Sequence, residues 1–341
     1  MQSYLKIHSL SILILTVAIM AGCGRKKQIP DVSHIPITVK IERFDRAFSG
    51  IDSTNVATGV KLLQEMYPGF MNDYLSHILY LPNTGDSAAL TRSVHDFLAN
   101  KDIRALNDSV GAHFADIRPL EQELTQAFRL AKYYQPKFRA PQVLTFISAV
   151  NNFGAVTIDS VLGIGLDMYM GADFNVYKLV PDMPEYMVRR FTPENIPVNV
   201  MTVLYQQLDA PREGASLAEQ LVYLGKQQYF LEQVLPETDA HIRMGYTSGQ
   251  MKFCEENEQM IWQYFVENKL LYNREGQTIA RYIGDGPSTQ GMPAEAPGKI
   301  GAFTGYRIVR AFMERHPEYT LEKLMGTQDA MLIFNGAKYR P

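Results

Sequence analysis

Apolar residues recur at helical spacing through much of the first third of the chain. This spacing predicts a helix over residues 55–81, interrupted at Pro68, and two more over residues 88–98 and 120–134, because one face of an α-helix repeats about every 3.6 residues and proline removes a backbone donor. Residues 39–48, ahead of these helices, begin with the alternation that is typical of a strand.

From residue 142 onward the apolar positions fall in short runs. Residues 143–147, 156–158 and 161–166 predict three short strands of one sheet. Helical spacing returns at residue 192, and the chain contains no internal repeat. We therefore predict an α+β fold in which helices pack around a small central sheet.

Three helices of the second half begin with recognisable capping signals. One starts at Thr192-Pro193, where a capping residue precedes proline at the first helical position. Capping boxes open two others, over residues 216–235 and 247–267. After a loop rich in proline and glycine, a further helix is predicted over residues 302–315.

Residues 1–22 have the pattern of a secretory signal peptide. Lys6 and His8 give a basic start, and the apolar run over residues 10–20 is too short for a membrane span, which needs roughly 20 apolar residues. Met20-Ala21-Gly22-Cys23 resembles the bacterial lipobox, in which the cysteine is acylated with palmitate-type chains and becomes the first residue. We predict lipidation at Cys23; the alternative is a secreted protein with a chance cysteine.

A polar tether follows the cysteine. Residues 23–36 comprise the lipidated cysteine and this tether, in which residues 24–35 would reach at most about 40 Å when extended. Arg25-Lys26-Lys27 lies beside the lipid, where anionic headgroups would attract it. We assign residues 37–341 to the globular part of the chain, as one large domain or two closely packed ones.

The composition is that of an ordinary globular protein. The chain has 341 residues, of which 46% are hydrophobic and 20% are charged, and its formal net charge is −3. Binding to nucleic acid requires a basic face, and the sequence shows no cationic cluster besides the one next to Cys23. The sequence therefore predicts a membrane partner, through the lipid anchor, and no nucleic acid partner.

The second cysteine, Cys254, has no partner once Cys23 is acylated. An oxidising compartment favours paired cysteines, so we expect Cys254 to be buried and unreactive.

Motifs for catalysis, metals and cofactors are missing from the sequence. None of the seven histidines has the spacing of a His-Glu-x-x-His zinc helix, and there is no Cys-x-x-Cys, Gly-x-Ser-x-Gly or phosphate-binding loop. Gly163-Ile164-Gly165 lacks the third glycine of a dinucleotide site, because Met168 stands in its place. We predict no cofactor, no metal site and no catalytic residues, and hence a protein that is not an enzyme.

Glu258 occupies an unusual position on the helix predicted from residue 247. At 100° per residue it falls in the middle of an apolar stripe, where a carboxylate must find a partner or lose its charge. On the later helix Arg310 lies on an apolar face, with Arg307 at its edge. We predict that Glu258 pairs with one of these arginines; a structural ion pair and a binding groove both remain open.

The segment from Gly165 to Tyr177 is rich in polar residues at the end of a strand. Asp167 and Tyr177 are its candidate functional residues, because loops at strand ends often carry function. Turn formation by glycine and aspartate explains the same composition equally well.

The chain is similar to the gliding motility-associated lipoprotein GldB family of Bacteroidetes, in register from about residue 37 to its end. The resemblance rests on Ile164-Gly-Leu-Asp-Met-Tyr-Met-Gly171, Pro184-Glu-Tyr-Met-Val-Arg-Arg190, Leu221-Val-Tyr-Leu-Gly-Lys226, Tyr246-Thr-Ser-Gly-Gln-Met251, Glu256-Asn-Glu-Gln-Met-Ile-Trp262, Ile300-Gly-Ala-Phe-Thr-Gly-Tyr-Arg-Ile-Val-Arg310 and Lys338-Tyr-Arg-Pro341.

This resemblance implies an accessory lipoprotein of the cell envelope that works with other proteins of a gliding-related machine. The family offers no catalytic residues to carry over. Lipoproteins that Bacteroidetes send to the cell surface usually carry acidic residues after the cysteine, whereas Arg25 follows closely here. We therefore expect an anchor that faces the periplasm.

A weaker resemblance is to zincin-like metallopeptidases. Where those enzymes carry the His-Glu-x-x-His helix, this chain has Tyr205-Gln206-Gln207 and no histidine, and in Leu224-Gly225-Lys226 leucine stands where their third ligand, a glutamate, would lie. The resemblance implies a degenerate zincin-like fold without its zinc. The alternative function is accordingly a noncanonical peptidase or peptide-binding protein, with a groove near Asp167, Tyr177 and Glu258.

Overall fold

The structure, a computed structural model, describes residues 29–82, 86–181 and 183–341. The chain divides into two compact units, Met1–His34 and Ile35–Pro341. In the first unit a turn is described in which the Ser33 N–H donates to Asp31 Oδ1 at 3.0 Å. The predicted signal peptide and Cys23 lie outside the described residues, so the predicted domain boundaries stay predictions.

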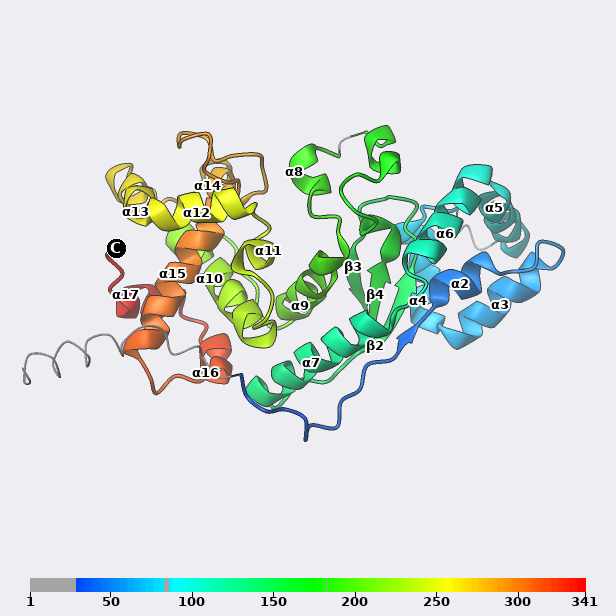
Figure 1. The fold of residues 1–341 in the computed structure, drawn as a ribbon, viewed down its shortest axis with the longest axis horizontal. Coiled ribbons are helices and arrows are strands. Elements are labelled where there is room, and N and C mark those ends of the chain that lie inside the picture. Colours follow the sequence, from blue (N-terminus) through cyan, green and yellow to red (C-terminus); the bar gives the residue numbers. More distant parts are fainter. Residues whose placement is uncertain (1–28, 83–85, 182) are drawn as a thin grey trace, which may run out of the picture. The chain divides into compact units, whose positions relative to one another are not determined.

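The second unit begins with a short strand that is followed by a group of helices (Figure 1). These elements are β1 (Ile41–Glu42), α2 (Phe44–Ser49), α3 (Val56–Met66), α4 (Pro68–Asp73), the π-helical turn η1 (Tyr74–Ile78), α5 (Ser87–Ala99), α6 (Lys101–His113) and α7 (Arg118–Tyr134). The helical spacing of residues 55–81, 88–98 and 120–134 is confirmed, and Pro68 opens α4 where the spacing is interrupted.

A small mixed sheet follows, as predicted. Its strands are β2 (Gln142–Phe146), β3 (Ala155–Ile158) and β4 (Val161–Gly165), and the order is β1-β2-β4-β3. β1, β2 and β4 are parallel, whereas β3 runs antiparallel to β4. α9 (Ile196–Gln206) contacts β3 and β4, α2 contacts β2, and α4 contacts β3, so the sheet lies among helices (Figure 1). The predicted α+β class is confirmed.

The rest of the unit is helical. Between β4 and α9 lie η2 (Leu166–Met168), η3 (Asn175–Leu179), α8 (Glu185–Val188) and η4 (Pro193–Asn195). After α9 come α10 (Leu217–Val234), α11 (Ala240–Met244), α12 (Ser248–Glu256), α13 (Glu258–Glu267), α14 (Gly276–Ile283), α15 (Ile300–Arg315), α16 (Leu321–Gly326) and α17 (Ala330–Ala337). Both predicted capping boxes are present, at the starts of α10 and α12.

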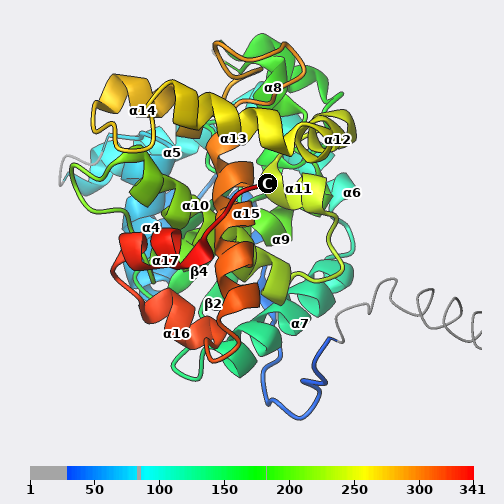
Figure 2. The ribbon, with the colours of Figure 1, turned by 90° about the vertical axis from the view of Figure 1, so that its left-hand side faces the viewer.

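Glycines set how closely α10 and α15 approach (Figure 2). A Cβ atom on Gly225 of α10 would lie 2.1 Å from the Gly305 carbonyl oxygen, and one on Gly305 would lie 1.9 Å from the Leu221 carbonyl oxygen. The two backbones therefore touch at a crossing that only glycine permits. α17 packs against both helices.

The strand predicted at the start of residues 39–48 is only two residues long. The chain turns into α2 at Phe44, because Phe44 and Phe48, four residues apart, both enter an aromatic core with Phe70, Tyr74 and others. In that core the Phe44 and Tyr74 rings meet edge to face, with centroids 5.0 Å apart. Tertiary packing outweighs the local alternation here.

The prediction of a single helix over residues 247–267 was wrong in one respect, because the helix breaks at Asn257. Asn257 has φ −117° and ψ 22°, and its side-chain amide donates to the Phe253 carbonyl oxygen at 2.9 Å. Asparagine competes with the helix for backbone groups in this way. Two helices, α12 and α13, result. Among the described residues no helix is long and apolar enough to cross a bilayer.

Candidate functional site

The predicted residues near the end of β4 hold a loop in place. Asp167 is fully buried; its Oδ1 accepts from the Ser148 N–H at 2.8 Å, and its Oδ2 accepts from the Val150 N–H at 2.7 Å and the Ser148 hydroxyl at 2.9 Å. Burial raises the pKa of this carboxyl, and the hydrogen bonds partly oppose that shift. The carboxylate stabilises residues 149 and 150 in left-handed conformations, with φ of 57° and 60°.

Tyr177 closes the same segment from the other side. Its hydroxyl donates to the Asp167 carbonyl oxygen at 2.7 Å and accepts from the Met170 N–H at 3.0 Å. The ring is buried, and burial raises the pKa of the phenol. Asp167 and Tyr177 therefore both use their hydrogen-bonding groups within the fold.

Glu258 lies at the start of α13 beside Arg307 of α15. Arg307 Nε donates to Glu258 Oε1 at 2.7 Å, and the Tyr339 hydroxyl donates to the same oxygen at 2.5 Å. The Glu258 side chain is 15% exposed, which agrees with its place near the apolar stripe. Arg310 lies elsewhere: it is half-exposed and bonds Glu314 at 3.1 Å.

The structure does not bring Asp167 and Tyr177 together with Glu258. Asp167 follows β4, while α13 packs against α12 and α15, away from the sheet (Figure 1). The sequence alone could not show this separation, because the apolar pattern within one helix or loop carries no information about distances between segments. A shared groove near the three residues has no support here.

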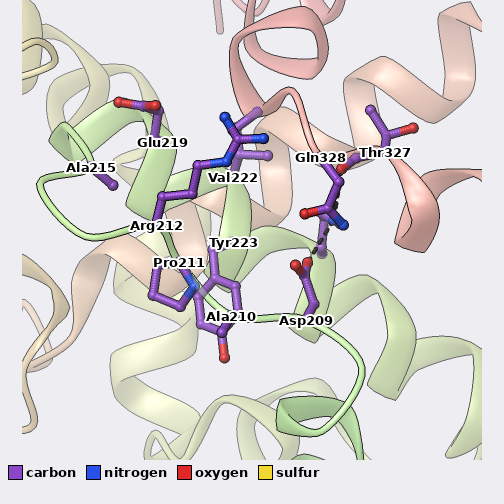
Figure 3. A pocket seen from close by; sticks show the side chains of 12 residues that line it. Asp209, Ala210, Pro211, Arg212, Ala215, Glu219, Val222, Tyr223, Thr327 and Gln328 are labelled. Atoms are coloured by element: carbon purple, nitrogen blue, oxygen red, sulfur yellow. Dashed lines mark hydrogen bonds and ion pairs between the residues drawn. The ribbon is translucent and has the colours of Figure 1, made fainter.

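A pocket of about 40 Å³ lies between the loop of residues 209–215, α10 and the turn that joins α16 to α17 (Figure 3). At its base Lys226 Nζ lies 2.6 Å from Asp209 Oδ2, and the two side chains are only 4% and 8% exposed. Lys226 also donates to the carbonyl oxygens of Met325 and Thr327, at 3.2 and 3.1 Å. Three acceptors thus surround the ammonium group, as a buried charge requires.

α9 and α10 place these groups. Tyr205, near the end of α9, donates its hydroxyl to Asp209 Oδ2 at 3.0 Å, so the helix end fixes the carboxylate that faces Lys226. Burial raises the pKa of Tyr205 well above its ordinary value. In the zincin-like resemblance Tyr205 lies in the segment without histidine and Leu224 stands at the third ligand position. In the structure Tyr205 instead donates to Asp209, and Lys226, two residues after Leu224, pairs with the same carboxylate.

The rim of the pocket carries a second charged set. Glu219 accepts from the Ser216 hydroxyl at 2.7 Å and the Ser216 N–H at 2.8 Å, and these hydrogen bonds lower the pKa of its carboxyl. Arg274 pairs with it at 3.2 Å, and Arg212 also lines the pocket. The charged residues that line the pocket itself are the acids Asp209 and Glu219 and the bases Arg212 and Lys226. The pocket therefore carries little net charge.

The size and charge of this pocket limit what it can hold. A volume of about 40 Å³ accommodates a few water molecules or a small polar group. Within the described ranges, no three His, Cys, Asp or Glu residues cluster so as to hold a metal ion. Sequence reasoning missed Asp209, although a lysine on the buried face of α10 is itself a signal that an acid must lie nearby.

Cys254 behaves as the sequence predicts. The thiol is buried and unpaired, and burial raises its pKa to about 12, which disfavours the reactive thiolate. Cys23, the predicted lipidation site, lies outside the described residues.

Comparison with known proteins identifies one family. A family model described as "Gliding motility protein GldB" matches residues 25–341. No curated protein and no solved structure matches the chain, so the likeness to zincin-like peptidases has no support from these comparisons.

Proposed function

The chain belongs to the gliding motility protein GldB family, and from this membership we propose that it acts as a membrane-anchored, non-enzymatic accessory lipoprotein of a gliding-related machine in the cell envelope. The observation that carries the proposal is the match over residues 25–341, which begins two residues after the lipobox cysteine Cys23.

The anchor is the acylated Cys23. One acyl chain binds a bilayer only marginally, at about 0.8 kcal/mol per buried CH₂, so two or three chains are needed for lasting attachment. The adjacent Arg25-Lys26-Lys27 adds attraction to anionic headgroups. A tether of about a dozen residues would let the folded unit reach partners near the membrane, and its basic character favours the periplasmic side.

The way in which the buried charges are used supports an accessory role. Lys226 is surrounded by Asp209 and two carbonyl oxygens, and Asp167 is surrounded by donors from residues 148–150. These groups stabilise connections between helices and loops. We infer that the work of the protein is done by contacts on its surface.

The Cys23→Ala substitution tests the anchor. We expect mass spectrometry of wild-type protein to find an acylated N-terminal peptide beginning at Cys23, and the substitution to abolish this acylation together with gliding of the host. Cys254→Ala is the matched control, since the other cysteine is buried in the fold; it should leave acylation and gliding intact. Wild-type protein that is unacylated and freely released would contradict the proposal.

A further inference from the structure

A concave surface lies where α13, α15, α17 and the end of the chain meet. It has a volume of about 520 Å³ and is lined by Trp262, Arg315, Phe334, Asn335, Lys338, Tyr339 and Arg340. Figure 2 shows the segment after α17 running to the C-terminal end beside α13 and α15. We call this the C-terminal pocket.

Three aromatic rings form one side of the C-terminal pocket. Trp262 meets Tyr339 edge to face, with ring centroids 5.0 Å apart and planes at 81°, and the Phe334 ring lies 6.3 Å from Trp262. Trp262 and Phe334 are only partly buried. Apolar ring surface therefore remains available in a hollow of the protein.

The aromatic side of the pocket is fixed before any ligand arrives. Tyr339 donates to Glu258 at 2.5 Å, and Arg307 holds the same carboxylate at 2.7 Å. The chain end is thereby tied to α13 and α15. A preformed site loses less conformational entropy when it binds.

The charges of the C-terminal pocket all have one sign. Arg315, Lys338 and Arg340 are exposed and line it together with no acidic residue. Among residues 29–82, 86–181 and 183–341, none forms an ion pair or a side-chain hydrogen bond with these three cations. Arg307 and Arg310, on the same helix as Arg315, are paired with Glu258 and Glu314. Unpaired positive charge thus gathers here on a chain whose net charge is −3.

We propose that the C-terminal pocket binds an acidic segment of a partner protein, with an apolar side chain against Trp262 and carboxylates beside Arg315, Lys338 and Arg340. The cations come from two separate segments, α15 and the chain end, so they suit charges spaced along an extended peptide. Trp, Tyr and Arg are the residues that dominate binding energy in protein interfaces, and Lys338 and the two arginines provide charge complementarity. This inference rests on the proposed accessory role, since it names the surface through which that role is exerted.

Intrinsic fluorescence tests the proposal directly, because Trp262 is the only tryptophan of the chain. The full chain in detergent micelles is titrated with the peptide acetyl-Asp-Glu-Phe-Glu-Asp-amide and, separately, with acetyl-Asn-Gln-Phe-Gln-Asn-amide. We expect the acidic peptide to change the Trp262 emission saturably and the neutral peptide to bind at least about tenfold more weakly. Added salt should weaken the binding of the acidic peptide, because exposed charges are screened.

Charge-matched variants locate the site. Arg315→Gln/Lys338→Gln/Arg340→Gln should bind the acidic peptide about tenfold or more weakly. Arg92→Gln/Lys101→Gln/Arg104→Gln removes the same charge from exposed positions on α5 and α6 and should bind like wild type. All six side chains are exposed, so thermal melting should show both variants folded.

Three results would overturn the inference: equal binding of the neutral peptide, equal losses in the two triple variants, or a response to phosphatidylglycerol vesicles without one to the peptide. If the Trp262 emission changed with protein concentration and not with added peptide, the pocket would be a contact between two copies of the chain, and the inference would also be wrong. None of these outcomes bears on Cys23, so loss of the anchor and loss of this site are separately detectable.

Discussion

At the scale of single residues, the buried charges are part of the framework of this protein. Lys226 and Asp209 are almost completely removed from water, and together with Tyr205 they join α9, α10 and the turn after α16. Desolvation makes such a pair only weakly stabilising relative to apolar residues, but removal of one partner leaves the other charge without compensation.

Lys226→Met should therefore lower the free energy of unfolding by about 3–5 kcal/mol, because the Asp209 carboxylate would stay buried without its cation. Urea denaturation measures this loss, and Asp209→Asn in the same background should recover part of it. Lys252→Met is the control, since Lys252 pairs with Glu256 at 3.7 Å in a setting where the side chains are 73% and 63% exposed; it should cost less than about 1 kcal/mol. Equal effects of the two methionine variants would refute this role of Lys226.

At the scale of secondary structure, the crossing of α10 and α15 organises the C-terminal half. Gly225 and Gly305 bring the backbones into contact, and Gly301 adds a further close approach, where a Cβ atom would lie 2.8 Å from Leu221 Cδ2. A glycine inside a helix is unfavourable by itself. Close packing between the helices is the physical reason for glycine at these positions.

Gly305→Ala should force the two helices apart. The added Cβ would meet the Leu221 carbonyl oxygen, which is backbone and cannot rotate away, so we expect a loss of about 3 kcal/mol in unfolding free energy, the upper end of ordinary overpacking. Gly111→Ala in α6 is the matched control, because nothing lies within 4 Å of its added methyl. The Gly111→Ala variant should be as stable as the wild type or more stable by up to about 1 kcal/mol. The prediction would be refuted if the Gly111→Ala variant were destabilised while the Gly305→Ala variant kept wild-type stability.

At the scale of the whole folded unit, the end of the chain is fastened to helices that are distant in sequence. Tyr339 contacts Glu258 and Trp262 of α13, and Arg307 of α15 holds the same carboxylate. This arrangement shapes the C-terminal pocket.

Tyr339→Phe removes the phenol hydroxyl and keeps the ring against Trp262. We expect it to lower the unfolding free energy by about 1.5–3 kcal/mol, as for the loss of a hydrogen bond to a charged group, and to do so much less when Glu258→Gln is already present. Chemical denaturation of the two single variants and the double variant measures this coupling. Tyr272→Phe is the control: Tyr272 is 67% exposed, so this substitution should change the unfolding free energy little. Strictly additive effects of Tyr339→Phe and Glu258→Gln would contradict the coupling.

Local sequence determined the parts of this protein that depend on near neighbours. The helices over residues 88–98 and 120–134, the capping boxes at Ser216 and Thr247 and the strands after residue 142 are confirmed, because periodicity and capping act over a few residues. Short sequence segments also carried the resemblance to the GldB family, which the match over residues 25–341 confirms. Helices α2, α6, α8, α11, α14, α16 and α17 were not predicted. All but α6 have eight residues or fewer, too few for a clear helical pattern, whereas α6 has 13 residues and an apolar periodicity like that of α5.

Only the tertiary structure decided which charged groups meet. The choice of Arg307 over Arg310 as the neighbour of Glu258 depends on how α13 turns after the break at Asn257, and the contact of Asp209 with Lys226 depends on the packing of α9 against α10. The C-terminal pocket joins Trp262 to residues more than 50 positions later in the chain. Such contacts are set by packing between segments that are far apart in sequence, and no pattern within a single helix contains that information.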